Sequence, residues 1–323
     1  MSFDDDAYGA LTDHDDDSRW AYGTGFADPL AGVPTAVPDG IDRADLVAYC
    51  LMLGDDALVM SHRLQQWVTR APELEDELAI ANIGLDLLGQ ARLLLSRAAE
   101  VEGEGRDEDG LAYLRGPHEF RNVRLAERAD EDFAHLVARL LIFAAWRLPL
   151  LDRLSGSRDP VLAAIGAKGV KEVTYHREYA AQWVVRLGDG TELSHRRMQA
   201  AVDAILPPAG ELFVPHEVES RLAAAGVAAD PASLREEFEA ALNQVLTAAT
   251  LTDPRPLAAN GSDPGEGMAP VDDARANSER EATGSSKRDG TGGGGRYGDH
   301  GPELKAILDE MQELARALPG GVW

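Results

Sequence analysis

Apolar residues recur at helical spacing along most of the chain, and this pattern predicts its main elements. In the first stretch, Leu46, Leu53, Met60 and Trp67 follow one another every seven residues, which places them on one face of a helix. A cleaner example begins at Phe133, where the apolar positions match the helical template throughout. The pattern predicts helices at residues 42–67, 72–100, 132–151, 159–187, 194–206, 217–225, 232–250 and 302–318.

Four of these predicted helices are long, and together they indicate an all-α fold. No stretch alternates apolar and polar residues in the way that a half-buried strand requires. Long helices rich in Leu and Ala form bundles by burying their apolar faces against one another. The connection between the second and third long helices spans about 30 residues, which leaves room for the crossover found in ferritin-like bundles. We therefore expect a ferritin-like helical bundle with additional C-terminal helices.

Composition divides the chain into four parts. Residues 1–40 contain Asp clusters, Gly and Pro without sustained periodicity, and we interpret them as an acidic flexible arm. Residues 41–252 form the predicted bundle. Residues 253–298 are rich in Gly, Ser and charge, which is typical of a low-complexity flexible linker. Residues 299–323 contain the last predicted helix, whose apolar face indicates a C-terminal docking helix.

The charge of the chain is strongly negative, which narrows its range of partners. The sequence has 56 acidic and 31 basic residues and a net charge of -25. Nucleic acids and anionic membrane surfaces are therefore disfavoured partners. All but four of the basic residues are arginine. Abundant carboxylates with scarce lysine are typical of a cytosolic protein from a halophile, and we interpret this chain as a halophilic acidic protein.

Cysteine content and the length of the apolar runs indicate the compartment. The single cysteine, Cys50, excludes an intramolecular disulfide and a thiolate zinc site. The N-terminal residues are acidic, whereas a secretory signal needs a basic start and an apolar run. The strongest apolar run, residues 140–146, is much shorter than the roughly 20 residues that span a bilayer. We expect a cytoplasmic protein without a membrane span.

A ferritin-like bundle raises the question of a di-iron site, which uses Glu from two helices and Glu-x-x-His from two others. Residues three apart share a helix face, so both side chains of the motif reach one metal. Only Glu192–His195 has this spacing, and Asp132–His135 is a weaker match; both lie in the first turn of a helix, where acids are common. The helix at 132–151 has no carboxylate after its first residue. We therefore predict that this chain binds no metal and no cofactor.

Six polar residues nevertheless fall on the apolar faces of the first, second and fourth long helices, and we interpret them as a vestigial di-iron region. They are Asp56, Asn82, Asp86, Lys168, Glu172 and His176. Because buried carboxylates must be paired or neutralised, we expect the lysine or the histidine to pair with Glu172 or Asp86. The alternative is that these are surface residues with ordinary pairs one helical turn apart.

Four segments of the chain resemble one known family. They are residues 51–67, 71–92, 157–176 and 308–323. The motif IANIGLDLLGQAR, at residues 80–92, is the longest and most specific. These segments are similar to the PaaC family, the non-catalytic ferritin-like subunits of multicomponent phenylacetyl-CoA epoxidases. The resemblance covers residues 43–250 and 299–323.

The family resemblance implies a role in aerobic phenylacetate degradation. It implies a structural subunit without catalytic residues, which supports a sister subunit of the same fold. That sister subunit holds the di-iron centre and epoxidises phenylacetyl-CoA. A small accessory subunit and a reductase are further expected partners. The absence of a Gly-x-Ser-x-Gly motif and of a phosphate-binding loop from the sequence agrees with this role.

The resemblance also implies a contribution to the groove that holds the CoA part of the substrate. The matching positions are Glu119, Phe120, Arg121, Asn122, Ser220, Arg221 and Leu222. Arginine can pair with phosphates, and phenylalanine can flank an adenine. The alternative is that Phe120 anchors a loop and that both arginines are solvated.

Two other functions stay open on the sequence. A stand-alone di-iron ferritin-like oxygenase would need two Glu-x-x-His motifs, of which only one has the right spacing. A purely structural acidic scaffold would be favoured if the protein never associates with a ferritin-like partner.

Overall fold

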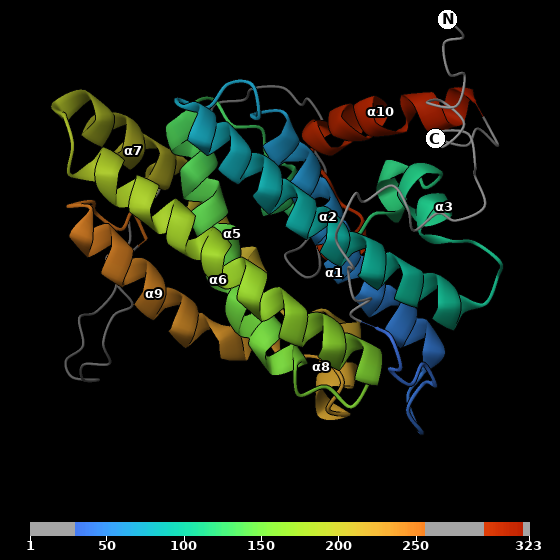
Figure 1. Cartoon of the computed structure of the whole chain (residues 1–323). Coiled ribbons are helices and arrows are strands. Elements are labelled where there is room, and N and C mark those ends of the chain that lie inside the picture. Colours follow the sequence, from blue (N-terminus) through green and yellow to red (C-terminus); the bar gives the residue numbers. More distant parts are fainter. Residues whose placement is uncertain (1–29, 256–293, 319–323) are drawn as a thin grey trace, which may run out of the picture.

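A computed structural model of the chain describes residues 30–255 and 294–318, and these residues form helices and no strand (Figure 1). The four long helices are α1 (Arg43–Gln65), α2 (Leu74–Glu102), α5 (Phe133–Leu154) and α6 (Pro160–Gly188). The shorter elements are α3 (Glu108–Tyr113), α4 (Arg124–Glu127), α7 (Glu192–Ile205), α8 (Glu217–Ala224), α9 (Arg235–Ala248), α10 (Pro302–Ala317) and the 3-10 helices η3 (Pro117–Glu119), η4 (Pro207–Phe213), η5 (Pro231–Leu234) and η6 (Gly295–Tyr297). The predicted all-α fold is confirmed.

Aspartate side chains begin long helices where the sequence predicts them. Asp42 begins α1 by accepting hydrogen bonds from the backbone N–H groups of Ala44 and Asp45. Asp159 begins α6 by accepting from the backbone N–H of Leu162. Each of these caps satisfies N–H groups that have no partner inside the helix, so the start of the helix is fixed locally by the sequence.

The long helices form two antiparallel hairpins that pack into one bundle (Figure 1). Residues 66–73 join α1 to α2, and residues 155–159 join α5 to α6. The second turn is tight because Gly166 lets the two helices approach closely; a Cβ there would lie 2.7 Å from Ser155 N. Residues 103–132 cross from α2 to α5 and carry α3, η3 and α4. Two hairpins joined by one long crossover make this a ferritin-like bundle.

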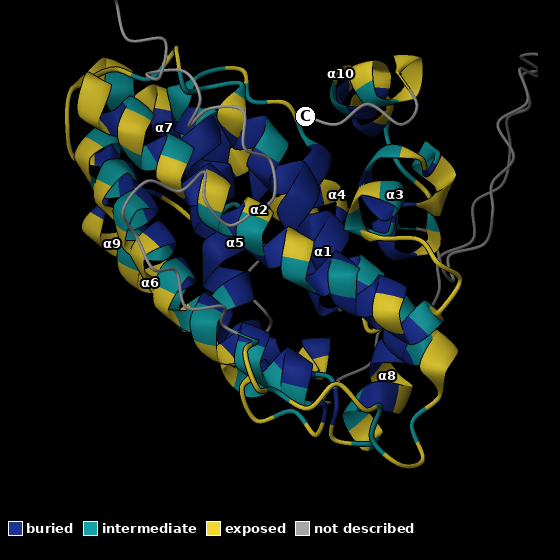
Figure 2. Ribbon diagram, turned by 45° about the vertical axis from the view of Figure 1, so that its right-hand side comes forward, coloured by how far each residue is buried: buried dark blue, intermediate teal, exposed yellow. Residues whose placement is uncertain are grey.

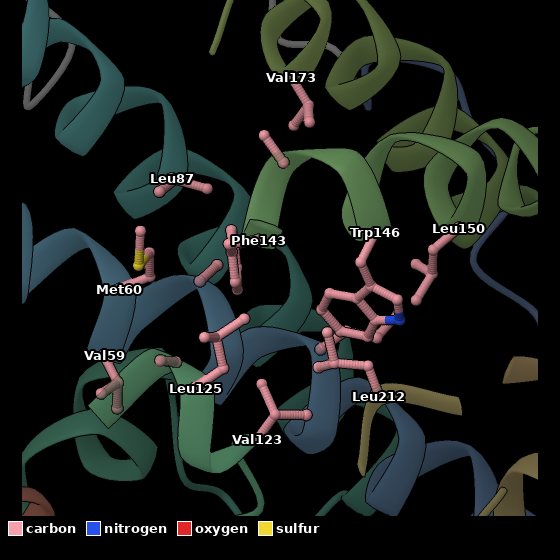
Figure 3. Packing of buried hydrophobic residues seen from close by; sticks show 14 of the residues in the cluster. Val59, Met60, Leu87, Val123, Leu125, Phe143, Trp146, Leu150, Val173 and Leu212 are labelled. Atoms are coloured by element: carbon pink, nitrogen blue, oxygen red, sulfur yellow. The ribbon is translucent and has the colours of Figure 1, made fainter. Parts of the chain in front are cut away.

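The core lies between the hairpins and follows α5, which is buried over nearly its whole length (Figure 2). Phe143 and Trp146 of α5 share one apolar cluster with Leu87 of α2 and Met60 of α1 (Figure 3). The two aromatic rings stand edge to face, with their centroids 5.8 Å apart. Burial of side chains of this size contributes about 1.5–3 kcal/mol each, so this cluster is a main source of the stability of the bundle.

Buried arginine–aspartate pairs connect the hairpins to the segments around them. Among the described residues, four such pairs have both side chains almost completely buried: Arg97–Asp159, Arg115–Asp55, Arg139–Asp130 and Arg296–Asp56. Arg97 of α2, for example, places Nη2 2.6 Å from Oδ2 of Asp159 and so ties α2 to the start of α6. Because removal of one partner leaves an uncompensated charge in the interior, each pair fixes two parts of the chain to each other.

Asp55 and Asp56 of α1 are fully buried neighbours that organise distant parts of the chain. Asp55 accepts from both terminal nitrogens of Arg115, at 2.5 and 3.0 Å, and from the backbone N–H of Arg121 at 2.9 Å. Asp56 accepts from both terminal nitrogens of Arg296 at 2.9 Å, and from a backbone N–H of the crossover at 2.8 Å. The crossover and η6 are therefore both attached to α1 by adjacent carboxylates.

The C-terminal segment, which we define as residues 294–318, packs closely on the bundle. Residues 294–298 have the composition of a linker, but they form η6 against the crossover. A Cβ on Gly295 would lie only 1.8 Å from Asn122 O, so glycine is required here for close approach rather than for flexibility. The first half of the apolar face of α10 is buried, with Leu304 and Leu308 0% and 1% exposed, whereas Leu314 near its end is 57% exposed.

The predicted arm is only partly described by the structure. Residues 30–40 contact the bundle, since Thr35 O accepts a hydrogen bond from Arg97 Nη1 at 2.6 Å. The rest of the predicted arm, most of the predicted linker and the end of the predicted docking helix lie outside the described residues; they are residues 1–29, 256–293 and 319–323.

We predict that Asp56→Ala destabilises the protein by roughly 3–5 kcal/mol, because it leaves the buried guanidinium of Arg296 without its partner. Asp45→Ala is the matched control, since the pair of Asp45 with Arg221 is exposed on the arginine side and should contribute little to stability. Urea unfolding of both variants measures the difference. Equal, small losses in the two variants would contradict the structural role of the Asp56–Arg296 pair.

Candidate functional site: the polar centre of the bundle

A polar network centred on Arg147 of α5 joins all four long helices. Arg147 Nε donates to Gln90 Oε1 of α2 at 2.9 Å, and Arg147 Nη2 donates to Leu53 O of α1 at 3.3 Å. Gln90 Nε2 in turn donates to Glu172 Oε2 of α6 at 2.9 Å. Arg147 and Gln90 are 0% and 1% exposed, so the middle of this bundle is polar and shielded from solvent.

The guanidinium group of Arg147 is buried away from solvent. Burial lowers the pKa of its guanidinium to about 10, and the nearby carboxylate of Asp56 acts in the opposite direction. The side chain therefore keeps its positive charge at neutral pH. Its Nη1 has no hydrogen-bond partner among the described residues, and its guanidinium carbon lies 5.6 Å from the ring centroid of Phe143.

Two further pairs border this centre on α6, as the sequence predicts. Lys168 forms an ion pair with Glu172 one turn away, and His176 Nε2 lies 3.0 Å from Asp86 Oδ2 of α2. The side chains of His176 and Glu172 are 2% and 14% exposed, whereas those of the other two residues are more than a third exposed. His176–Asp86 joins two helices as expected, whereas Lys168–Glu172 is a pair one turn apart on a single helix, which the alternative also allowed.

Asn82 and Asp56, the other two of the six residues predicted for the interior, take no part in these pairs. Asn82 is exposed on α2, so its assignment to the interior is wrong. Each four-residue step along a helix advances by about 40° beyond a full turn, so the row of residues 82, 86 and 90 turns from solvent into the core. Asp56 is buried as predicted, and it pairs with Arg296 of the C-terminal segment.

The donor groups at this centre do not fit a di-iron site. Such a site takes carboxylates from all four helices of the bundle, whereas α5 contributes the cation of Arg147 and α2 contributes the amide of Gln90. Glu172 does face the network, but Lys168 already neutralises it. Across residues 30–255 and 294–318, no three His, Cys, Asp or Glu side chains come together as a metal-binding group.

Both sequence matches to a metal motif have structural roles. Asp132 caps α5, since its Oδ1 accepts from the backbone N–H of His135 at 3.0 Å and lies 2.7 Å from Nδ1 of the same residue. His195 Nδ1 lies 2.6 Å from a carbonyl oxygen at the end of α6. Glu192 points to solvent and pairs with Arg196 one turn later. Neither motif joins the polar centre.

Three of the seven candidate CoA-binding residues, Phe120, Asn122 and Leu222, are buried. The guanidinium of Arg115 lies over the ring of Phe120, 4.3 Å from its centroid. Asn122 Nδ2 donates to Glu127 Oε2 at 3.2 Å. These side chains anchor the crossover and α8, and they do not present a surface to a ligand in this structure.

The other four candidates lie at or near the surface. Glu119 accepts from a backbone N–H at 2.7 Å at the start of η3, and Arg121 Nη1 donates to two carbonyl oxygens of its own segment at 2.7 and 2.8 Å. Arg221 makes two hydrogen bonds to Asp45, at 2.6 and 2.7 Å, and Ser220 is exposed. Both arginines are therefore already paired within the protein, Arg121 with backbone carbonyls and Arg221 with a carboxylate.

Arg296 brings the two candidate CoA-binding segments together. Its Nη1 donates to Arg121 O at 2.8 Å, and its Nε lies 3.9 Å from Glu219 Oε1 of α8. Beside it, the ring of Tyr297 packs on the ring of His216 with centroids 4.4 Å apart. The C-terminal segment is therefore part of this surface.

The arginines of the core were missed by sequence reasoning. Arg139 and Arg147 interrupt an otherwise apolar stretch of α5, and both are 0% exposed. That interruption is a usable signal, because a charge in the middle of a fully apolar helix must find a buried partner. Arg296 offered no comparable signal, because it follows four glycines in a segment with the composition of a linker.

The outer face of α2 is apolar and exposed to solvent. Leu74, Leu78, Leu85 and Leu88 lie on one side of the helix and are 66%, 57%, 58% and 41% exposed. In the part of the chain that the structure describes, only α2 and α5 are long and apolar enough to cross a membrane, and their most apolar windows are 44% and 89% buried. α5 is thus a core helix, whereas α2 presents an apolar surface on a molecule of charge -25.

Comparison with known proteins shows to which family this chain belongs. Residues 33–267 match the family described as phenylacetic acid catabolic protein. The chain belongs to this family. It is also 42% identical over 278 residues to the C subunit of the 1,2-phenylacetyl-CoA epoxidase of Escherichia coli (strain K12), an alignment that covers 86% of this chain and 99% of that protein. The resemblance to the PaaC family is confirmed.

For this member of the phenylacetic acid catabolic protein family, we predict that Gln90→Leu destabilises the fold by about 1–3 kcal/mol, because a buried charged donor loses its acceptor. Arg147→Met combined with Gln90→Leu removes both partners, so the double variant should lose less than the sum of the single variants. Urea unfolding of the four proteins gives the coupling energy. A coupling energy near zero would show that Gln90 does not compensate Arg147.

Proposed function

We propose that this chain is a cytoplasmic, non-catalytic subunit of a 1,2-phenylacetyl-CoA epoxidase complex in aerobic phenylacetate degradation. The observation that carries the proposal is the match along nearly the whole length of the C subunit of the Escherichia coli enzyme. In the proposed complex a ferritin-like sister subunit holds the di-iron centre and oxidises the ring. This chain binds that subunit and keeps its helices in place.

The charges in the middle of the bundle support a non-catalytic role. Oxygen-activating iron is held by groups that can donate negative charge to it. The middle of this bundle instead holds the fixed positive charge of Arg147, and the carboxylate of Glu172 is balanced by Lys168. Added iron would bring further positive charge to this position. The network gives the bundle an internal connection between its four helices that does not depend on a metal.

The leucines on the outer face of α2 support a partner-binding role. Burial of each exposed leucine against a partner would contribute roughly 1.5–3 kcal/mol. α2 is itself held by α1 on one side and by the Asp86–His176 and Gln90–Glu172 contacts with α6 on the other, so the face is preformed. Obligate interfaces are large and more apolar than the rest of the surface. We assign this face to the sister subunit.

We predict that Leu78→Glu combined with Leu85→Glu weakens binding of the sister subunit by at least 100-fold, about 3 kcal/mol, since two charges would have to be desolvated at the interface. Leu314→Glu with Leu318→Glu is the matched control, because these leucines, on α10 and directly after it, are 57% and 51% exposed. Sedimentation of each variant with the sister subunit measures affinity. Equal binding by both double variants would rule out α2 as the interface.

In this proposal, the surface residues of the two candidate segments are the ones that contribute to CoA binding. Arg121, Ser220 and Arg221 can face the phosphates of the ligand, as guanidinium groups commonly do. Arg221 would have to exchange its pair with Asp45 for a phosphate. Phe120 could not flank an adenine without leaving its position under Arg115, so the aromatic contact would have to come from elsewhere.

We predict that epoxidation requires both subunits. The catalytic subunit, a reductase and phenylacetyl-CoA are combined with and without this chain, and product is quantified by mass spectrometry. The rate should fall at least tenfold without this chain, because a loosened neighbour displaces the ligands of the iron. This chain alone with the reductase should give no product. Turnover by this chain alone would support a stand-alone oxygenase, and an undiminished rate without it would remove the supporting role.

A further inference from the structure

A pocket of about 340 Å³ lies at the end of the bundle where α7 packs on α5 and α6 (Figure 1). Its walls are mainly apolar and come from four parts of the chain: Pro72 before α2, Phe133 at the start of α5, Trp183 and Leu187 near the end of α6, and Leu193 at the start of α7. The pocket shares no residue with the polar centre or with the candidate CoA-binding segments. None of the roles described above uses it.

Two aromatic rings form one wall of the pocket, and their positions are fixed. Phe133 and Trp183 stand edge to face, with their centroids 4.9 Å apart. The indole Nε1 of Trp183 donates to Oδ1 of Asp76 at 2.8 Å, and Asp76 is buried. Because this hydrogen bond holds the indole in place, the wall is preformed. A preformed wall lowers the entropic cost of binding a flat apolar group.

The start of α7 supplies polar groups to the same pocket. Thr191, Ser194 and Arg197 line it, and their three-residue spacing places them on one face of the helix. α7 is attached to the end of α6, since His195 Nδ1 lies 2.6 Å from the carbonyl oxygen of Gly188. The polar groups therefore have a fixed position relative to the aromatic wall.

Arg197 is the cationic group of the pocket, and its guanidinium is unpaired. It is exposed and makes no hydrogen bond or ion pair with a residue of the ranges 30–255 and 294–318. Its neighbour Arg196, by contrast, pairs with Glu192 and does not line the pocket. A free guanidinium beside an apolar pocket is available to a carboxylate, which it can bind through two parallel hydrogen bonds.

The acidic residue of the pocket gives such a ligand its orientation. Asp132 is the one carboxylate among the described residues that line the pocket, and its Oδ1 already accepts from the backbone N–H of His135 at 3.0 Å. A ligand carboxylate is repelled by Asp132 and attracted by Arg197. It therefore points to α7, and the apolar part of the ligand lies against Phe133 and Trp183.

We propose that this pocket binds a small aromatic carboxylate, whose ring lies between the apolar walls and whose carboxylate pairs with Arg197. Its volume is near the lower end of the roughly 300–1,000 Å³ of ligand pockets, which suits one ring with a short acid chain. The charge alone is not sufficient, because water and salt screen an ion pair at an exposed arginine. This inference is independent of the proposed function, since the site lies within this chain.

Isothermal titration calorimetry of the full-length protein with phenylacetate tests the pocket. Phenylacetamide has the same ring without the charge, and acetate has the charge without the ring. We expect phenylacetate to bind with a Kd of about 1 mM or below, as the best-placed small ligands do, and phenylacetamide at least about tenfold more weakly. Acetate should give no measurable binding.

Two results of this titration would overturn the inference. The first is the absence of measurable binding of phenylacetate at about tenfold the expected Kd. The second is equal affinity for phenylacetate and phenylacetamide, which would assign the pocket to an uncharged apolar group such as a side chain of a partner subunit.

Arg197→Gln locates the site, because it removes the cation from an exposed position where the fold does not depend on it. The affinity for phenylacetate should fall at least about tenfold, as expected for the loss of a hydrogen bond to a charged group. Arg196→Gln is the matched control and should bind as the wild-type protein does, since this arginine lies outside the pocket. Wild-type affinity in Arg197→Gln, or an equal loss in both variants, would overturn the inference.

Leu193→Glu tests the apolar side of the pocket independently. Leu193 is 52% exposed, so the fold tolerates the change, and the new carboxylate repels the ligand. The affinity for phenylacetate should fall at least about tenfold. Leu114→Glu is the control, because this leucine is 66% exposed on the crossover and does not line the pocket. Unchanged binding by Leu193→Glu would place the ligand elsewhere and contradict the proposal.

Discussion

The burial of two adjacent carboxylates, Asp55 and Asp56, is the constraint on which most of this structure depends. Two negative charges side by side inside a helix bundle are tolerated only if each has its own cation and further donors. Arg115 of the crossover and Arg296 of η6 meet that requirement, and backbone N–H groups complete it. The long connection and the C-terminal segment thus become parts of the folded unit, although η6 is separated from α1 by more than 200 residues.

A buried arginine also connects the four long helices in the middle of the bundle. Arg147 links α5 to α1 and α2 directly and to α6 through Gln90. A bundle held in this way keeps four helices in register without help from a metal, and it is free to present a rigid outer face. The exposed leucines of α2 lie on the opposite side of a helix whose inner side belongs to this network. The proposed supporting function follows from these two features together: a connected interior and an apolar face for a partner.

The parts of the fold that depend on local sequence could be predicted. The long helices follow from apolar spacing and from caps such as Asp159, and the His176–Asp86 contact follows from polar residues on facing stripes. Asn82 was misplaced because a row of every fourth residue winds around the helix. The short helices of the crossover have too few residues for a periodic signal. The partner of Asp56 could not be predicted, because Arg296 is brought to it only by the tertiary fold.

Binding of ferrous iron to this chain, purified without its partners, tests the central claim most directly. Anaerobic titration followed by equilibrium dialysis and elemental analysis gives the number of irons bound per chain. Because Arg147 holds a positive charge in the middle of the bundle and Lys168 pairs with Glu172 at its border, the account predicts no stoichiometric iron. Two irons bound per chain, and lost in Glu172→Gln, would contradict it.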